Sequence, residues 1–245
     1  MKVAGSIALV TGANRGLGLA FAKVLLAMGA AKVYAAARNP EAVTLKGVVP
    51  LKLDVTSDAD AAAAARAAED VNLLVNNAGI ARPGGFLAEG AIDVAREQLE
   101  VNFVGPLRMA RAFAPILAKN GGGAIINVLS VASWMNGPML ATYGASKSAA
   151  WALTNGLRIE LADHGTQVVG LHAGFIDTDL TRNVDAPKSA PEDIVRTTLD
   201  ALERGEGQVL ADEITRQVHR GLSADHPAYF QSTAALRSRV GTPAA

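Results

Sequence analysis

The chain has 245 residues, half of them hydrophobic, and a formal net charge of zero. This predicts one large α/β domain with a buried core, and it excludes the strong electrostatic surface of proteins that bind nucleic acids or anionic membranes. The absence of cysteine excludes disulfides, thiolate metal sites and a cysteine nucleophile.

The first elements surround a glycine loop. Residues 7–11 are apolar and predict a buried parallel strand, and residues 19–28 predict an alanine-rich helix. Gly12, Gly16 and Gly18 lie between them, in the order Gly-x-x-x-Gly-x-Gly rather than the common Gly-x-Gly-x-x-Gly. A glycine loop before a helix lets the backbone approach a pyrophosphate, which the free N–H groups of the helix bind. The segment therefore predicts a dinucleotide site.

The end of the second strand bears on the choice of dinucleotide. Residues 31–37 predict this strand, after which NAD-specific sites usually carry an acidic residue for the ribose 2′-hydroxyl. This chain has Ala37 and Arg38 there, and Arg15 adds a second cation in the glycine loop. With no carboxylate to repel a 2′-phosphate and arginines to bind it, we expect NADP(H) in preference to NAD(H). The alternative is that both arginines are solvated surface residues that do not contact a cofactor.

The middle of the chain continues the alternation of strands and helices. Residues 48–53 and 72–75 predict strands, and an alanine-rich helix between them runs to about residue 70 with Ser57 or Asp58 as its cap. Residues 91–117 predict a long helix with Asn102 inside it. Because Pro106 has no N–H for the Asn102 carbonyl, we expect a local distortion there. The alternative is that Asn102 is a buried amide whose hydrogen bonds are satisfied within the fold and which has no role in the site.

Acid–base chemistry is indicated by Tyr143 and Lys147. Residues 124–129 predict a strand that ends at Ser130, and either Ser130 or Ser133 can line a site at its end. Residues 142–161 predict a helix on which Tyr143 and Lys147 share one face. A nearby ammonium is expected to lower the pKa of the phenol, so that it exchanges a proton near neutral pH.

Residues 167–171 and 207–210 predict the last strands, with a helix opening at Pro191 between them. We expect a flexible loop over about 178–190 and a polar tail over about 222–245. Strands alternating with helices predict a single-domain, Rossmann-type, doubly wound parallel sheet with helices on both faces and right-handed crossovers.

Taken together, these motifs resemble the short-chain dehydrogenase/reductase family over nearly the full chain. The matching residues are Thr11, Gly12, Gly16, Gly18, Asp54, Asn76, Asn77, Ala78, Gly79, Asn102, Ser130, Tyr143 and Lys147. Ser130 precedes Tyr143 by the family's usual spacing, which favours it over Ser133. Ala173 replaces the family's proline in the segment that contacts the nicotinamide, and we expect a less rigid turn there.

The resemblance implies catalytic roles for four residues. Tyr143 would donate or accept the proton, Lys147 would lower its pKa and hold the nicotinamide ribose, and Ser130 would hold the substrate oxygen. Asn102 would hold a water that connects Lys147 to solvent.

The resemblance also implies which residues contact the cofactor. The three loop glycines would hold the pyrophosphate, Asp54 would face the adenine and Asn76 the adjacent ribose. The full set of expected contacts is Gly12, Asn14, Arg15, Gly16, Leu17, Gly18, Arg38, Asp54, Val55, Asn76, Ala78, Gly79, Tyr143, Lys147, Gly174, Ile176 and Thr178.

The sequence thus predicts an NADP(H)-dependent carbonyl reductase or alcohol dehydrogenase. The resemblance implies that the connection between Ser130 and Tyr143 borders the substrate pocket, and its apolar residues would suit an apolar or aromatic small-molecule ketone or alcohol: Trp134, Met135, Met139 and Leu140. The alternative is that these residues belong to the core. One alternative is a 3-oxoacyl-thioester reductase, with Arg82 and Arg108 as contacts for a phosphopantetheine carrier. Another is a non-catalytic NADP-binding sensor, which would not need the complete catalytic set.

Remaining expectations concern metals, location and assembly. The four histidines lack metal-ligand spacing, so no metal site is expected, and neither His164 nor His172 is expected to be a catalyst. No apolar run reaches the roughly 18 residues of a membrane span, and the N-terminus lacks a signal-peptide pattern, which predicts a cytoplasmic protein. The family resemblance suggests a homodimer or homotetramer.

Overall fold

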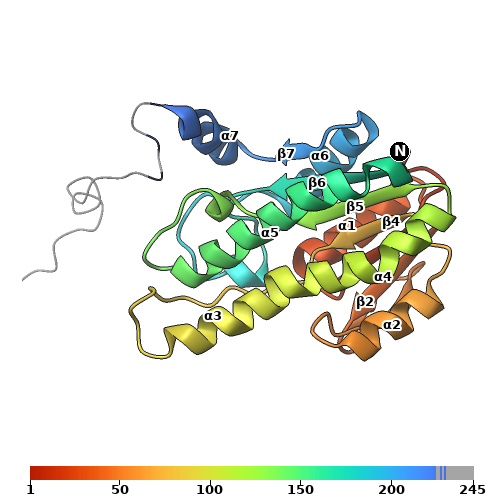
Figure 1. Cartoon of the computed structure of the whole chain (residues 1–245), viewed down its shortest axis with the longest axis horizontal. Coiled ribbons are helices and arrows are strands. Elements are labelled where there is room, and N and C mark those ends of the chain that lie inside the picture. Colours follow the sequence, from red (N-terminus) through yellow and green to blue (C-terminus); the bar gives the residue numbers. More distant parts are fainter. Residues whose placement is uncertain (225–226, 228, 230–245) are drawn as a thin grey trace, which may run out of the picture.

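The computed structural model describes residues 1–224, 227 and 229. A seven-stranded sheet in the order β3-β2-β1-β4-β5-β6-β7 forms the centre of the fold, and every neighbouring pair is parallel (Figure 1). The strands are β1 (Ile7–Thr11), β2 (Lys32–Ala37), β3 (Val49–Lys52), β4 (Leu73–Asn76), β5 (Gly123–Val128), β6 (Thr166–His172) and β7 (Gln208–Leu210). The predicted doubly wound α/β sheet is therefore confirmed.

Helices cover both faces of this sheet, because short parallel strands that are apolar throughout need burial on both sides. The helices are α1 (Gly16–Ala27), α2 (Asp58–Ala67), α3 (Ala91–Leu99), α4 (Gly105–Lys119), α5 (Ala141–Glu160), α6 (Pro191–Glu203) and α7 (Glu213–Arg220). One core joins the sheet to α1 and α6, around the fully buried Phe21 and Ile194. The other joins it to α2, α4 and α5, around Phe113.

The long helix predicted over residues 91–117 is interrupted, as expected at Asn102. A π-helical turn, Glu100–Val104, separates α3 from α4, and the Gly105 N–H donates to the Glu100 carbonyl. Pro106 has no N–H to donate to Asn102, so the regular helical ladder is already broken at this point. The extra residue in the turn directs the buried Asn102 side chain toward the end of β4.

Several element boundaries differ from the sequence prediction. Helix α1 begins inside the glycine loop, at Gly16, and α2 ends at Ala67, before residue 70. The expected flexible loop contains a 3₁₀ turn, Asp179–Thr181. Helix α7 was not predicted, because it is short and strongly polar on average. The expected tail over 222–245 lies mostly outside the described residues.

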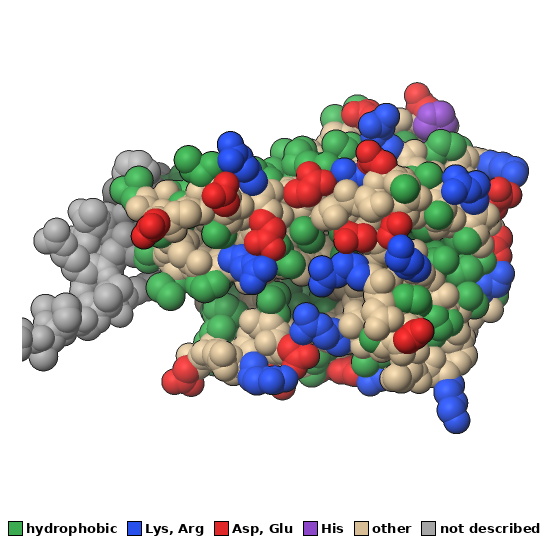
Figure 2. Space-filling model, turned by 90° about the horizontal axis from the view of Figure 1, so that it is seen from below, with side chains coloured by type: hydrophobic (Ala, Val, Ile, Leu, Met, Phe, Trp, Pro, Cys, Tyr) green, Lys and Arg blue, Asp and Glu red, His purple; other side chains and the backbone are tan. Residues whose placement is uncertain are grey.

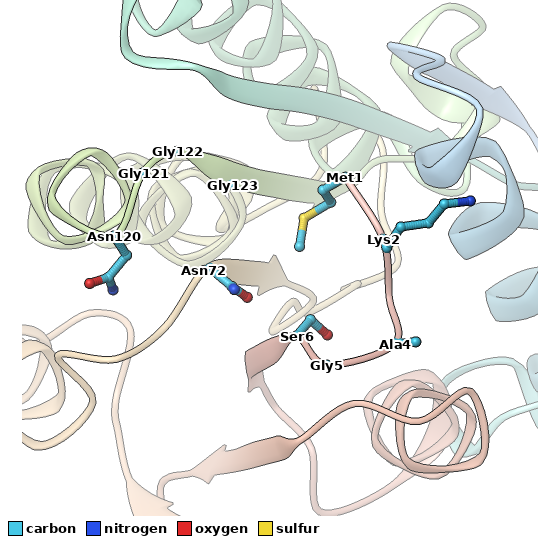
Figure 3. Close-up of a pocket in the computed structure, with 10 residues that line it drawn as sticks. All are labelled: Met1, Lys2, Ala4, Gly5, Ser6, Asn72, Asn120, Gly121, Gly122 and Gly123. Carbon is cyan, nitrogen blue, oxygen red and sulfur yellow. The ribbon is translucent and has the colours of Figure 1, made fainter.

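A shallow hollow of about 280 Å³ marks the amino-terminal edge of the sheet (Figure 3). It lies between Ser6, just before β1, and the glycine turn before β5. Gly122 and Gly123 have φ of 94° and 157°, and a Cβ on Gly123 would lie 2.1 Å from the Asn72 carbonyl oxygen. The hollow thus reflects a tight backbone turn, at the end of β1 opposite to the glycine loop.

Charged side chains are mixed on the surface. Figure 2 shows acidic and basic groups interspersed over the face seen from below, with no field of one sign. Within the described part of the chain, no helix is both long and apolar enough to span a membrane.

Candidate active site

The carboxyl ends of the strands bring the predicted site residues to one edge of the sheet. The chain order reverses between β1 and β4, and ligands of doubly wound sheets bind at such a switch point. The glycine loop follows β1 there, Asn77 follows β4, Ser130 follows β5 and Ala173 follows β6.

The glycine loop is fixed to the end of β4. The Thr11 hydroxyl accepts from the backbone N–H groups of Asn77 and Ala78, both at 2.9 Å, and Asn77 Nδ2 donates to the Thr11 carbonyl at 2.8 Å. Gly12 has a positive φ of 66°, and a Cβ on Gly18 would lie 2.2 Å from the Gly12 carbonyl oxygen. The backbone at Gly12 therefore lies too close to Gly18 to leave room for a side chain at Gly18.

The start of α1 fits an anionic group. Arg15 is its N-cap and provides no side-chain cap, whereas Ser57 caps α2 and Asp212 caps α7. Among the described residues, none outside the helix bonds the N–H groups of its first turn, which belong to Gly16, Leu17 and Gly18. Free N–H groups and the positive end of the helix dipole suit a pyrophosphate.

Tyr143, Lys147 and Ser130 meet at the start of α5. Tyr143 and Lys147 are one helical turn apart, and Lys147 Nζ lies 5.8 Å from the centroid of the Tyr143 ring. The Ser130 hydroxyl hydrogen-bonds the Tyr143 phenol and also accepts from the Ala132 N–H at 3.1 Å. The Ser133 hydroxyl is buried without a described partner. The geometry thus favours Ser130 over Ser133.

The pKa of Tyr143 differs from the sequence expectation. Burial raises it above the usual 10.0, and the hydrogen bond from Ser130 lowers it only in part. The Lys147 ammonium lies 5.8 Å from the ring centroid and donates to the Val128 carbonyl at 2.7 Å, and the effect of burial on the phenol is larger than its own. Burial lowers the pKa of Lys147 to about 8. The site therefore holds a protonated phenol beside a lysine that can lose a proton near neutral pH.

Asn102 ties three segments together with its side chain. Its amide bonds the backbone N–H and carbonyl of Ile80, each at 2.9 Å, and donates to Ser146 Oγ at 2.9 Å. A Cβ on Gly79 would lie 3.1 Å from Asn102 Oδ1 and 3.7 Å from Lys147 Nζ. Asn102 is thus a neighbour of Lys147. Both hydrogens of its Nδ2 are engaged, so a bound water would have to donate to Oδ1 or to the backbone carbonyl.

The residues expected to contact the adenosine half of the cofactor differ in how accessible they are. The Asn76 side chain is buried and its Nδ2 donates to Asn127 Oδ1 at 2.9 Å, while its Oδ1 has no partner among the described residues. Its contact with the ribose stays a prediction. Asp54 Oδ1 accepts from the Thr56 N–H and hydroxyl, which lowers the pKa of the carboxyl. Val55 lies buried beside it.

The two arginines expected at the 2′-phosphate differ in their surroundings. Arg15 forms an ion pair with Asp179 at 3.3 Å, which ties the glycine loop to the loop after β6. Arg38 is exposed, and within the described part of the chain it makes no hydrogen bond or ion pair. The positive field of Arg38 lowers the pKa of Asp54, which places the two near each other. Arg38 is therefore the freer cation for a ligand.

The turn after β6 is held by a residue that the sequence analysis missed. Asp212 Oδ2 accepts from the Gly174 N–H at 2.6 Å, while Oδ1 caps α7 through the Thr215 N–H at 2.8 Å. The buried Ala173 accepts from Val131 at 2.9 Å. A hydrogen-bonded clamp thus holds the turn where the family has proline. An Asp before a polar amphipathic segment was the available signal for this cap.

The remaining expected contacts lie on the same segment. A Cβ on Gly16 would meet the Thr178 side chain at 3.5 Å, so this loop packs on the glycine loop. Ile176 pairs with Ser189 in a short parallel bridge, which closes the segment between them. Whether the loop over 178–190 moves stays a prediction.

Arg82 and Arg108, the expected contacts of a carrier, differ in their surroundings. Arg82 forms two hydrogen bonds with Glu97 on the surface, at 2.9 and 3.2 Å. Arg108 contacts Asp58 and donates to Glu100 at 3.0 Å and to the Val55 carbonyl at 2.7 Å. Arg108 is therefore largely engaged within the fold, whereas Arg82 is exposed. Among the described residues, no group of His, Asp or Glu side chains could hold a metal ion.

His172 lies behind Ser130, at the end of β6. Its ring is fully buried and stacks on Trp134, with centroids 3.8 Å apart and planes 18° apart. Burial lowers the pKa of His172 from 6.5 to about 4, and the nearby cations His219, Lys147 and Arg158 act in the same direction. The hydrogen bond to the Ser130 carbonyl opposes this shift. His172 is therefore neutral at physiological pH.

This burial predicts an acid-sensitive fold. The unfolded chain takes up a proton on His172 below about pH 6.5 and the folded chain only below about pH 4, so stability is complete above this window and falls within it. We expect a loss of about 1.4 kcal/mol in the free energy of unfolding per pH unit in the window. Urea unfolding at about pH 7 and about pH 5 measures it. His172→Asn should lose this slope and His164→Asn, at an exposed site, should keep it; equal slopes in both would contradict the assignment.

Comparisons with known proteins agree with this geometry. A family model described as short chain dehydrogenase matches residues 6–189. The short chain dehydrogenase tazN of Aspergillus terreus is 34% identical over 205 residues, which are 76% of this chain and 44% of that protein, so the chain spans less than half of this relative.

Two solved structures are also similar. A short chain dehydrogenase from Burkholderia cenocepacia J2315 in complex with NADP has 42% identity and a TM-score of 0.89, and the match covers 99% of this chain and all of that one. A 3-ketoacyl-(acyl-carrier-protein) reductase from Brucella melitensis complexed with NADH has 28% identity and a TM-score of 0.77, covering 84% and 96%.

Fold and site together define a Rossmann-type doubly wound domain whose glycine loop is suited to a dinucleotide. The chain belongs to the short-chain dehydrogenase family.

Proposed function

We propose that the protein is an NADP(H)-dependent oxidoreductase that interconverts a ketone or aldehyde and the corresponding alcohol. The observation that carries the proposal is the Tyr143 phenol, which contacts the Ser130 hydroxyl and has Lys147 above its ring. NADP(H), when bound, supplies or accepts the hydride. In reduction, Ser130 holds the substrate oxygen and Tyr143 protonates it. Lys147 then returns a proton to Tyr143, which a pKa of about 8 allows.

Two observations support NADP(H) over NAD(H). Arg38 is exposed, follows Ala37 where a carboxylate would favour NAD, and lies near the Asp54 loop. The similar Burkholderia structure is a complex with NADP, although the Brucella structure is a complex with NADH.

Arg38→Ala is expected to raise the Kd for NADPH about ten- to hundredfold and to leave the Kd for NADH nearly unchanged, because one or two charge-assisted hydrogen bonds to the 2′-phosphate are lost. Side-by-side titration of both nucleotides measures this. Arg66→Ala, which removes an exposed arginine near the far end of α2, is the matched control. Equal effects on NADPH and NADH would refute the 2′-phosphate role.

Exposed apolar side chains next to the segment before α5 support an apolar carbonyl substrate. Gly84 pairs with Leu140 just before α5, and Phe86, Leu87 and Met139, near this junction in the sequence, are exposed. Leu180 and Ile214 are exposed on the segments that hold the loop after β6. We expect NADPH-dependent turnover to rise with the apolar character of a panel of ketones and aldehydes.

A 3-oxoacyl-thioester reductase is the second candidate, supported by the similarity to the Brucella enzyme. The partly buried pairing of Arg108 with Glu100 disfavours a carrier contact there, whereas the exposed Arg82 remains a candidate. Comparing an acetoacetyl thioester with a simple apolar ketone distinguishes the two candidates. Faster turnover of the thioester would favour the second, and no NADPH consumption with any carbonyl would refute both.

A further inference from the structure

The His172 ring makes a directed contact with Ser130. Its Nδ1 lies 3.1 Å from the Ser130 carbonyl oxygen. A carbonyl only accepts, so Nδ1 must carry the proton of the neutral ring. Nε2 is buried and has no partner among the described residues. This agrees with an unprotonated Nε2 that carries a lone pair. The ring is fully buried and stacks on Trp134.

The Ser130 peptide receives this contact together with two backbone hydrogen bonds, one of which runs from the Val131 N–H of the same peptide group to the Ala173 carbonyl at 2.9 Å. Strand β5 ends at Val128, and Ser130 begins a 3₁₀ turn, Val131–Ser133. The Ser130 carbonyl accepts from the Ser133 N–H at 3.0 Å as well as from His172. In the described part of the chain, His172 is thus the only side chain that bonds the Ser130 backbone. The direction of the Ser130 hydroxyl follows from the orientation of this peptide.

We propose that His172 is a positioning residue, whose Nδ1–H holds the Ser130 peptide so that the hydroxyl stays against the Tyr143 phenol. This inference rests on the proposed function, in which Ser130 orients the substrate oxygen. The buried, neutral ring is suited to the task, because it donates one hydrogen bond in a fixed direction and places no charge near Lys147. A displacement of the hydroxyl by a fraction of an ångström would slow proton transfer rather than weaken cofactor binding.

Two substitutions separate the hydrogen bond from the packing. His172→Phe keeps a flat ring for Trp134 and removes the donor. His172→Asn loses the ring but keeps a nitrogen donor the same number of bonds from Cα as Nδ1. We expect His172→Phe to lower kcat about tenfold with little change in the KM for NADPH, and His172→Asn to stay within about threefold of the wild type. The same exchanges at the exposed His164 are the matched controls.

The opposite ranking would overturn the inference. Wild-type kcat in His172→Phe, or an equal or larger loss in His172→Asn, would show that packing and not the donor matters. If either variant fails to fold, ¹⁵N-histidine NMR of the wild-type protein decides: a neutral ring protonated at Nδ1 supports the inference, and a proton at Nε2 refutes it. Absence of any carbonyl turnover in the wild type would instead refute the proposed function and with it the catalytic role of His172, whereas the NMR result would still report on the hydrogen bond.

Discussion

Replacing Tyr143 by phenylalanine is expected to lower kcat about a thousandfold and to change the Kd for NADPH by less than about threefold. The exchange removes one hydroxyl and keeps the ring beneath Lys147. Because burial raises the pKa of the phenol, Tyr143 is protonated at neutral pH and is ready to act as the acid in carbonyl reduction. Ser130 can still hold the substrate oxygen in the variant but has no acidic proton to give.

Tyr34→Phe is the matched control for this substitution. Tyr34 lies on strand β2, and its hydroxyl donates to Asp70 Oδ1 at 2.9 Å. The hydroxyl also accepts from Lys32. Its loss is expected to reduce stability without changing kcat. A Tyr143→Phe enzyme with kcat within about tenfold of the wild type would show that another group transfers the proton. Loss of NADPH binding in that variant would show that the phenol serves the cofactor rather than the reaction.

Much of this site could be predicted, because its backbone requirements are local. The glycine loop follows from Gly12 and Gly18, which leave no room for side chains, and the π-helical turn follows from Pro106. Tyr143 and Lys147 share a face because a single helix spaces them. In each case a few consecutive residues determine the geometry, so pattern and spacing were sufficient.

Features that depend on contacts between distant segments could not be predicted in this way. The hydrogen bond of Asn76 to Asn127 joins the neighbouring strands β4 and β5, whose residues are far apart in the sequence. Arg15 pairs with Asp179, which is far away in the sequence. The pKa of Tyr143 rises where the sequence suggested a fall, because burial outweighs a lysine that is itself buried. His172 gained its contact with Ser130 only through the register of β5 and β6.

Replacing Gly18 by alanine is expected to raise the Kd for NADPH about a hundredfold, which corresponds to the loss of two charge-assisted hydrogen bonds. The new Cβ would lie 2.2 Å from the Gly12 carbonyl oxygen and 2.6 Å from Asn77 Nδ2. Neither atom is free to move, since Asn77 Nδ2 is bonded to Thr11 and Gly12 is part of the tight loop. The loop must therefore open, and the first N–H groups of α1 lose their alignment with a pyrophosphate.

Gly156→Ala provides the matched control, because Gly156 is also helical but a Cβ added to it would meet nothing beyond its own helix within 4 Å. There the added methyl group should raise the free energy of unfolding by roughly 0.5–1 kcal/mol, since glycine is the more costly residue in a helix. Gly18→Ala should lower it by roughly 1–3 kcal/mol, as expected for an overpacked site. Urea unfolding and NADPH titration of both variants measure these differences. If Gly18→Ala bound NADPH as the wild type does, the loop would be able to relax around a side chain, and contact with the phosphates would have to come from elsewhere.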